Sequence, residues 1–114
     1  CINGEIFDVI VDLRQSSKTF LSWAGILLNS KIKNQIWIPN GFAHGFLTMS
    51  EDAIVEYKVT NYWDKALERT LLWKDSLISI EWPRSEDELI KPNLSLKDNN
   101  GLTLDHLLKK GELF

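Results

Sequence analysis

The chain has 114 residues, of which 44% are hydrophobic, including five Trp and five Phe, so one domain with a buried core is expected. Its 13 basic and 16 acidic side chains leave a net charge of −3, which excludes a broad basic surface for nucleic acid or anionic lipid. The single cysteine, Cys1, excludes an internal disulfide, and no apolar run approaches the ~20 residues of a membrane span. We therefore expect a single domain over residues 1–114 in the cytoplasm, with neither nucleic acid nor membrane as a partner.

Hydrophobic alternation predicts strands through most of the chain. The first is Glu5–Asp12 (EIFDVIVD), which is rich in β-branched and aromatic residues. Its two faces carry Phe7, Val9 and Val11 on one side and Ile6, Asp8 and Ile10 on the other. Further strands are expected at Phe20–Leu28, His44–Met49, Ala53–Thr60 and, more briefly, Thr70–Trp73.

The last third of the chain has a different character. Arg84–Asn100 is polar and contains Pro92, and because it lies between the apolar residues Trp82 and Leu102 we expect an ordered loop rather than a linker. Leu102–Lys109 has a leucine stripe at helical spacing, with Gly111 just beyond it as a stop signal. Short strands about 8–12 residues apart, with a helix only at the C-terminus, favour an all-β antiparallel sandwich or barrel.

His44 follows a tight turn formed by Pro39 and Gly41 and opens a strand, from which its ring could point into the mouth of a barrel. A lone histidine is more often structural than functional, and that alternative stays open here. The Pro-x-Gly-x-x-His spacing also resembles one motif of metal-binding cupins. Such sites need two or three histidines and a carboxylate, whereas this chain has only His44 and His106, so we expect no metal site within it.

Tyr57 lies on one face of the expected strand together with Val55 and Val59. The pattern favours a core tyrosine, and the alternative is a phenol that donates a proton inside a barrel. Trp63 follows that strand and could stack on a nucleobase or pack at a rim.

Several segments together resemble the dTDP-4-dehydrorhamnose 3,5-epimerase family of the cupin superfamily. These segments span nearly the whole chain, in the family's order. They are Gly4-Glu5-Ile6-Phe7-Asp8-Val9, Val11-Asp12-Leu13-Arg14, Trp37-Ile38-Pro39, Gly41-Phe42-Ala43-His44-Gly45-Phe46, Tyr57-Lys58, Thr60-Asn61-Tyr62, Ile80-Glu81-Trp82-Pro83, Leu94-Ser95 and Lys97-Asp98.

The resemblance implies a cupin-like jelly roll and a cofactor-independent isomerase that acts on a dTDP-4-keto-6-deoxy sugar in dTDP-rhamnose biosynthesis. It implies that Tyr57 is the catalytic acid and that Asp98 orients a catalytic histidine. Contacts with the substrate are implied for His44, Glu68 and Lys97. Trp63 stands where relatives carry the tyrosine that stacks on thymine, so the ring is kept.

In the family the catalytic base is a histidine on a strand upstream of the point where this sequence starts. The chain begins at Cys1 without a Met, so we read it as a piece lacking the N-terminal strands and expect it to be inactive alone. Family members are homodimers that exchange such strands. Two alternatives remain, a metal-dependent cupin enzyme and a non-catalytic sugar-nucleotide binding protein.

Overall fold

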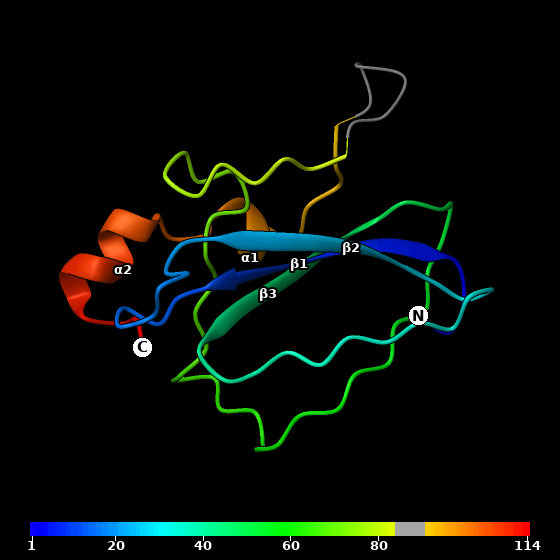
Figure 1. Cartoon of the computed structure of the whole chain (residues 1–114). Helices are drawn as coiled ribbons and strands as arrows, with labels where there is room; N and C mark the ends of the chain where they lie inside the picture. Colours follow the sequence, from blue (N-terminus) through cyan, green and yellow to red (C-terminus); the bar gives the residue numbers. More distant parts are fainter. Residues whose placement is uncertain (84–90) are drawn as a thin grey trace.

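Three strands form one antiparallel sheet in the computed structural model, which describes residues 1–83 and 91–114. The strand order is β2-β1-β3, so the first strand of the sequence is the central one (Figure 1). Two short helices follow, both in the C-terminal part. The elements are β1 (Glu5–Asp12), β2 (Trp23–Asn29), β3 (Phe42–Thr48), α1 (Leu96–Asn99) and α2 (Leu104–Lys110).

β1 is the central strand of the sheet and carries buried residues on both of its faces. It pairs along its length with β2, from Glu5 opposite Asn29 to Val11 opposite Trp23. On its other side it pairs with β3. A strand with neighbours on both edges has all its ladder positions filled, and Ile6, Val9 and Val11 are each at most 3% exposed.

One face of the sheet carries the core. Val9 and Val11 pack there with Ile78 and with Leu104, which is fully buried on α2. The helix is well bounded, because the Thr103 side chain accepts a hydrogen bond from the backbone at its start and Gly111 takes a left-handed conformation at its end. Figure 1 accordingly shows α2 beside the end of the sheet where β1 terminates.

A glycine in β2 is required by this packing. A Cβ placed on Gly25 would lie 2.2 Å from the Phe7 ring on the neighbouring strand. That ring also makes an edge-on contact with Trp82, with centroids 6.3 Å apart. The absence of a side chain at Gly25 therefore lets Phe7 lie across β2 and hold the 80–82 segment against the sheet.

The opposite face of the sheet is buried along β1 and exposed at positions on its two outer strands. Ile26 and Phe46 are 42% and 43% exposed on it. Asp8, Ile10 and His44 lie on the same face, since Asp8 is opposite Phe46 and Ile10 is opposite His44. This face thus combines apolar side chains with an imidazole and a carboxylate, which is a combination that can bind a ligand.

The expected elements are confirmed in part. Glu5–Asp12 is a strand with the predicted bounds, and the strand expected at His44–Met49 is present as Phe42–Thr48. The second strand begins at Trp23 rather than Phe20, because residues 20–21 belong to a turn in which Leu21 has a φ of 65°. The C-terminal helix begins at Leu104, since Thr103 is its N-cap.

Two strand predictions were wrong. Ala53–Thr60 is irregular apart from a bridge between Asn3 and Ile54, and Thr70–Trp73 has only a bridge between Leu71 and Leu102. Alternation alone does not make a strand when no neighbouring strand is available to fill the backbone ladder. The loop expected at Arg84–Asn100 contains α1, and its residues 84–90 lie outside the described part. Both helices are too short to cross a bilayer, and no membrane-spanning helix occurs among the described residues.

Candidate functional site

His44 is held on the open sheet face by a carboxylate. Its Nε2 lies 2.8 Å from Asp8 Oδ2, and its side chain is 33% exposed, against 3% for Asp8. Asp8 is diagonal to His44 across the β1–β3 ladder, and diagonal neighbours on one face are within reach of long side chains. The Phe46 ring is 6.3 Å away, tilted by 42°. The lone histidine therefore has a fixed polar partner and an aromatic neighbour.

A second polar group gathers around an ion pair between Glu68 and Lys97. The Lys97 Nζ lies 2.6 Å from Glu68 Oε1, although 29 positions separate the residues in sequence. The ammonium of Lys97 lowers the pKa of Glu68, and the Glu68 carboxylate raises the pKa of Lys97. Both groups are consequently charged at neutral pH.

Three further predicted site residues lie around this pair. After Lys97, which has the larger effect, Trp63 also lowers the pKa of Glu68. Asp98 and Tyr57 both contribute electrostatically to raising the pKa of Lys97. Five of the six residues singled out from the sequence are thus linked electrostatically, and we call Tyr57, Trp63, Glu68, Lys97 and Asp98 the Glu68–Lys97 cluster, in which the contact between Glu68 and Lys97 is direct. The sixth, His44, lies on the sheet with Asp8.

The interpretation of Tyr57 as a core residue was wrong. Its side chain is 72% exposed, and that of Trp63 is 70% exposed, because the Ala53–Thr60 segment leaves the sheet instead of extending it. Two exposed rings beside an ion pair form a surface that a flat, charged ligand could cover.

Asp98 is oriented by the first turn of α1. Ser95 is the N-cap, and its Oγ accepts a hydrogen bond from the Asp98 backbone N–H at 3.1 Å. The same hydroxyl lies 2.6 Å from Asp98 Oδ2, to which it donates. No described histidine contacts this carboxylate, so its role in orienting one stays a prediction.

The backbone around α1 is tied to the segment that carries Glu68. Leu102 donates to the Thr70 carbonyl at 2.7 Å, and Leu72 donates to the Leu102 carbonyl at 2.8 Å. Gly101 allows this close approach, since a Cβ there would lie 2.8 Å from the Leu72 Cα. This parallel bridge brings Lys97 and Glu68 together from distant parts of the sequence.

A separate polar network surrounds Asp12 at the C-terminal end of β1. Asp12, 1% exposed, accepts hydrogen bonds from Arg14, Ser17 and Thr19. The Arg14 guanidinium, helped by the two hydroxyls, holds the pKa of Asp12 far below its usual range. Because every donor comes from the turn after β1, we assign this network to holding that turn.

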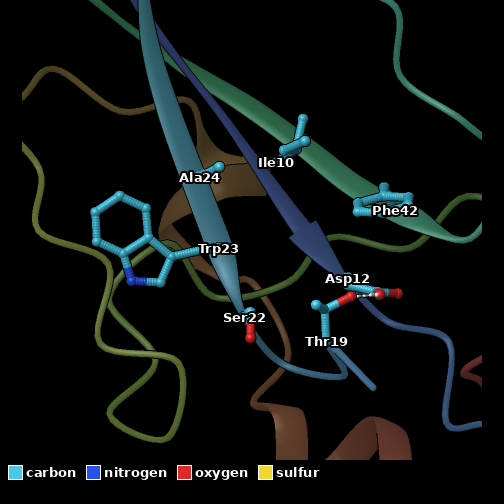
Figure 2. A pocket seen from close by; sticks show the side chains of 7 residues that line it. All are labelled: Ile10, Asp12, Thr19, Ser22, Trp23, Ala24 and Phe42. Atoms are coloured by element: carbon cyan, nitrogen blue, oxygen red, sulfur yellow. Dashed lines mark hydrogen bonds between the residues drawn. The ribbon is translucent and has the colours of Figure 1, made fainter. Parts of the chain in front are cut away.

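Beside this network lies a cavity of about 260 Å³. Figure 2 shows Ile10, Ala24 and Phe42 around it, the Thr19 hydroxyl pointing at Asp12, and the Trp23 ring pointing away. Its wall is mostly apolar, and none of the residues singled out from the sequence lines it.

Sequence reasoning missed Asp8 and Asp12 as residues with specific partners. The signal was present, since both are acidic positions on an otherwise apolar strand. Within residues 1–83 and 91–114, no three His, Cys, Asp or Glu side chains are grouped as a metal ion would require. His44 lies on β3 and His106 on α2.

Solved structures of sugar-nucleotide epimerases superpose on nearly the whole of this chain. A dTDP-6-deoxy-D-glucose-3,5-epimerase of Legionella pneumophila, solved with dTDP-4-keto-L-rhamnose, superposes with a TM-score of 0.83 at 37% identity, over 98% of this chain and 57% of that one. The 3'-monoepimerase ChmJ of Streptomyces bikiniensis, solved with dTDP-quinovose, has a TM-score of 0.88 at 30% identity, over 99% and 55%.

The chain belongs to the dTDP-4-dehydrorhamnose 3,5-epimerase family, whose profile matches residues 1–106. The enzyme of that name from Salmonella typhimurium is 49% identical over 108 residues, which are 95% of this chain and 57% of the relative. The Escherichia coli enzyme is 42% identical over 109 residues, again 57% of its length. This chain thus spans little more than half of the relatives it matches, and the resemblance stated from the motifs is confirmed.

Proposed function

We propose that the protein carrying this chain epimerises a dTDP-4-keto-6-deoxy sugar at C3 and C5, in dTDP-rhamnose biosynthesis. The observation that supports this most is the Glu68–Lys97 cluster, where an ion pair joins two segments 29 positions apart and Tyr57, Trp63 and Asp98 act on the pKa values of that pair. Family membership sets the reaction class, and the cluster supplies a phenol, an ammonium and an aromatic surface of the kinds that the reaction uses.

The chemistry needs proton transfer on two faces of the sugar and no redox cofactor. Carbons C3 and C5 flank the C4 ketone, so each can lose its proton to a base and leave an enolate. Tyr57 then returns a proton to the opposite face and inverts the centre. A positioned acid or base typically contributes about 10²–10⁴-fold to such a step. Cationic or hydrogen-bonding groups near the ketone oxygen stabilise the negative charge that develops there.

The nucleotide end of the substrate is assigned to the exposed rim of the cluster. The Trp63 ring stacks on the thymine, and a base stacked on an aromatic ring gains about 1–3 kcal/mol. Glu68 and Lys97 make polar contacts with the substrate, and His44 contacts the sugar from the sheet. An ion pair that is already formed offers both a donor and an acceptor without first being reorganised.

The proposal extends to the assembly of the whole protein. The base is a histidine supplied from outside these 114 residues and oriented by Asp98. The sheet is part of a cupin-like jelly roll in a cytoplasmic homodimer that exchanges strands. The exposed face of the three-stranded sheet and the exposed Tyr57 support this, because both would be covered by added strands. The chain alone is then inactive.

Solvent exchange tests the reaction directly. The full-length protein is incubated in D₂O with dTDP-4-keto-6-deoxyglucose, and deuterium at C3 and C5 is followed by NMR. We expect incorporation at both carbons, unaffected by EDTA. Loss of activity on chelation would identify a metal-dependent enzyme instead. Binding of dTDP without any exchange would identify a non-catalytic sugar-nucleotide binder.

A further inference from the structure

We propose that Asp8 is a positioning residue for the reaction, which acts by fixing the ring of His44 in one tautomer and one orientation. This rests on the proposed function, in which His44 contacts the sugar. Asp8 itself is 3% exposed, so its effect on a ligand passes through the imidazole.

The geometry defines which nitrogen carries the hydrogen. Nε2 of His44 lies 2.8 Å from Asp8 Oδ2, and an ionised carboxylate can only accept a hydrogen bond. The hydrogen between them is therefore on Nε2. The other nitrogen, Nδ1, has no partner among the described hydrogen bonds that involve His44, and in the neutral ring it is an acceptor for a ligand hydroxyl.

The burial of Asp8 indicates that its carboxylate serves the contact with His44 and not the stability of the fold. Asp8 Oδ1 is a buried side-chain atom without a hydrogen-bond partner among the described residues. Leaving a buried oxygen unpaired is unfavourable, and an apolar residue between Ile6 and Ile10 would pack on the same face without that loss. Two buried aspartates serve as a contrast, because both oxygens of Asp12 and of Asp75 accept hydrogen bonds from the protein.

The position on the sheet makes the contact rigid. Asp8 lies in the centre of β1, with Ile26 opposite on β2 and Phe46 opposite on β3. His44 is likewise paired within β3, opposite Ile10. Both backbones are thus fixed by the ladder, and the hydrogen bond fixes the remaining freedom of the ring. A ring fixed in this way can present the same nitrogen in every turnover.

The ring of the wild-type protein provides the first test. Full-length protein labelled with ¹⁵N-histidine is examined by NMR under conditions where the ring is neutral, with His44 assigned from the His44→Asn variant. We expect Nε2 to carry the hydrogen and Nδ1 to be bare. A ring protonated on Nδ1 would overturn the proposal, and this result does not depend on any variant folding or on any activity.

A double-mutant cycle provides the second test. Asp8→Asn keeps the shape and removes the charge, and we expect kcat/KM to fall about 10- to 100-fold, the range found for residues that orient metal-ligating histidines. In the His44→Asn background the same change should cost nothing further. An equal loss in both backgrounds would show that Asp8 does not act through His44 and would overturn the proposal.

The matched control is Asp75→Asn, which alters another buried aspartate on the core side of the molecule. It should lower the melting temperature and leave the His44 spectrum unchanged. If the full-length protein catalyses no deuterium exchange, the proposed function fails, while the ¹⁵N spectrum still decides whether Asp8 sets the tautomer. If exchange occurs and Asp8→Asn matches the wild type, only the inference about Asp8 fails.

Discussion

The sheet and the Glu68–Lys97 cluster carry site residues in two very different ways. On the sheet, His44 lies on β3, whose backbone is paired with the buried strand β1. In the cluster, Tyr57 and Trp63 belong to irregular segments and have exposed rings. The segments that carry Glu68 and Lys97 are joined by their ion pair and by the bridge between Leu71 and Leu102. The sheet is therefore a scaffold that exists without a ligand, whereas the cluster is a surface that a ligand or further chain can complete.

The two regions should also differ in how much stability a substitution removes. The sheet is stabilised by apolar burial and ladder hydrogen bonds, so a substitution in its core lowers the stability of the whole cooperative unit. The pair between Glu68 and Lys97 is partly exposed, and such pairs contribute little to stability. Changes in the cluster should therefore alter function and spare the fold, and changes in the core should do the reverse.

The largest effect is expected from Tyr57→Phe in the full-length protein. The substitution removes the hydroxyl and little volume, so turnover should fall about 10²–10⁴-fold while the melting temperature stays unchanged. Rates of deuterium incorporation at C3 and C5 measure the loss. Undiminished turnover would remove Tyr57 from the mechanism.

On the core side, Leu104→Ala should produce the largest loss of stability. Leu104 is fully buried between α2 and the sheet, and truncating such a leucine costs about 2–5 kcal/mol. Urea denaturation measures the change. Leu108→Ala on the same helix is the matched control, since Leu108 is 37% exposed and should cost much less. Equal losses at the two positions would show that α2 is not docked through Leu104.

Trp63→Ala should weaken nucleotide binding and leave stability unchanged. Loss of one stacked base corresponds to about 1–3 kcal/mol, or roughly 5- to 150-fold in the dissociation constant of dTDP. Calorimetric titration of the full-length protein with dTDP measures it. Trp63→Tyr should retain most of the affinity because the ring is kept, so a tyrosine variant as weak as the alanine variant would argue against stacking.

The smallest effect concerns acid pH. Lys97 lowers the pKa of Glu68 below 4.5 in the folded protein, so the pair's contribution to stability is complete above that value and is lost as pH falls through the lower pKa. A ¹³C titration of the Glu68 carboxyl should show this lowered pKa. In Lys97→Met it should move back toward 4.5. A Glu68 pKa that is the same in both proteins would mean that the pair does not form in solution.

Much of the site was predictable because its residues lie within recognisable motifs. The Gly41–Phe46 segment pointed to His44, and the Lys97-Asp98 pair lay in a family segment. What the pattern could not reveal was the Glu68–Lys97 contact, since nothing local relates two residues 29 positions apart. The partner of His44 was also missed, because alternation placed Asp8 on the correct face of the strand without specifying what lay diagonally across the ladder.

The sequence by itself determined the elements whose information is local. Glu5–Asp12 is a strand because its β-branched residues suit a buried central position, and α2 forms because the leucine stripe has a threonine cap before it and a glycine after it. Only the tertiary structure decided the fate of Ala53–Thr60, whose alternation resembles a strand. A strand needs a neighbour to satisfy its backbone, and among the described residues that segment finds one only at Ile54. This is why Tyr57 lies exposed beside Lys97 rather than in the core.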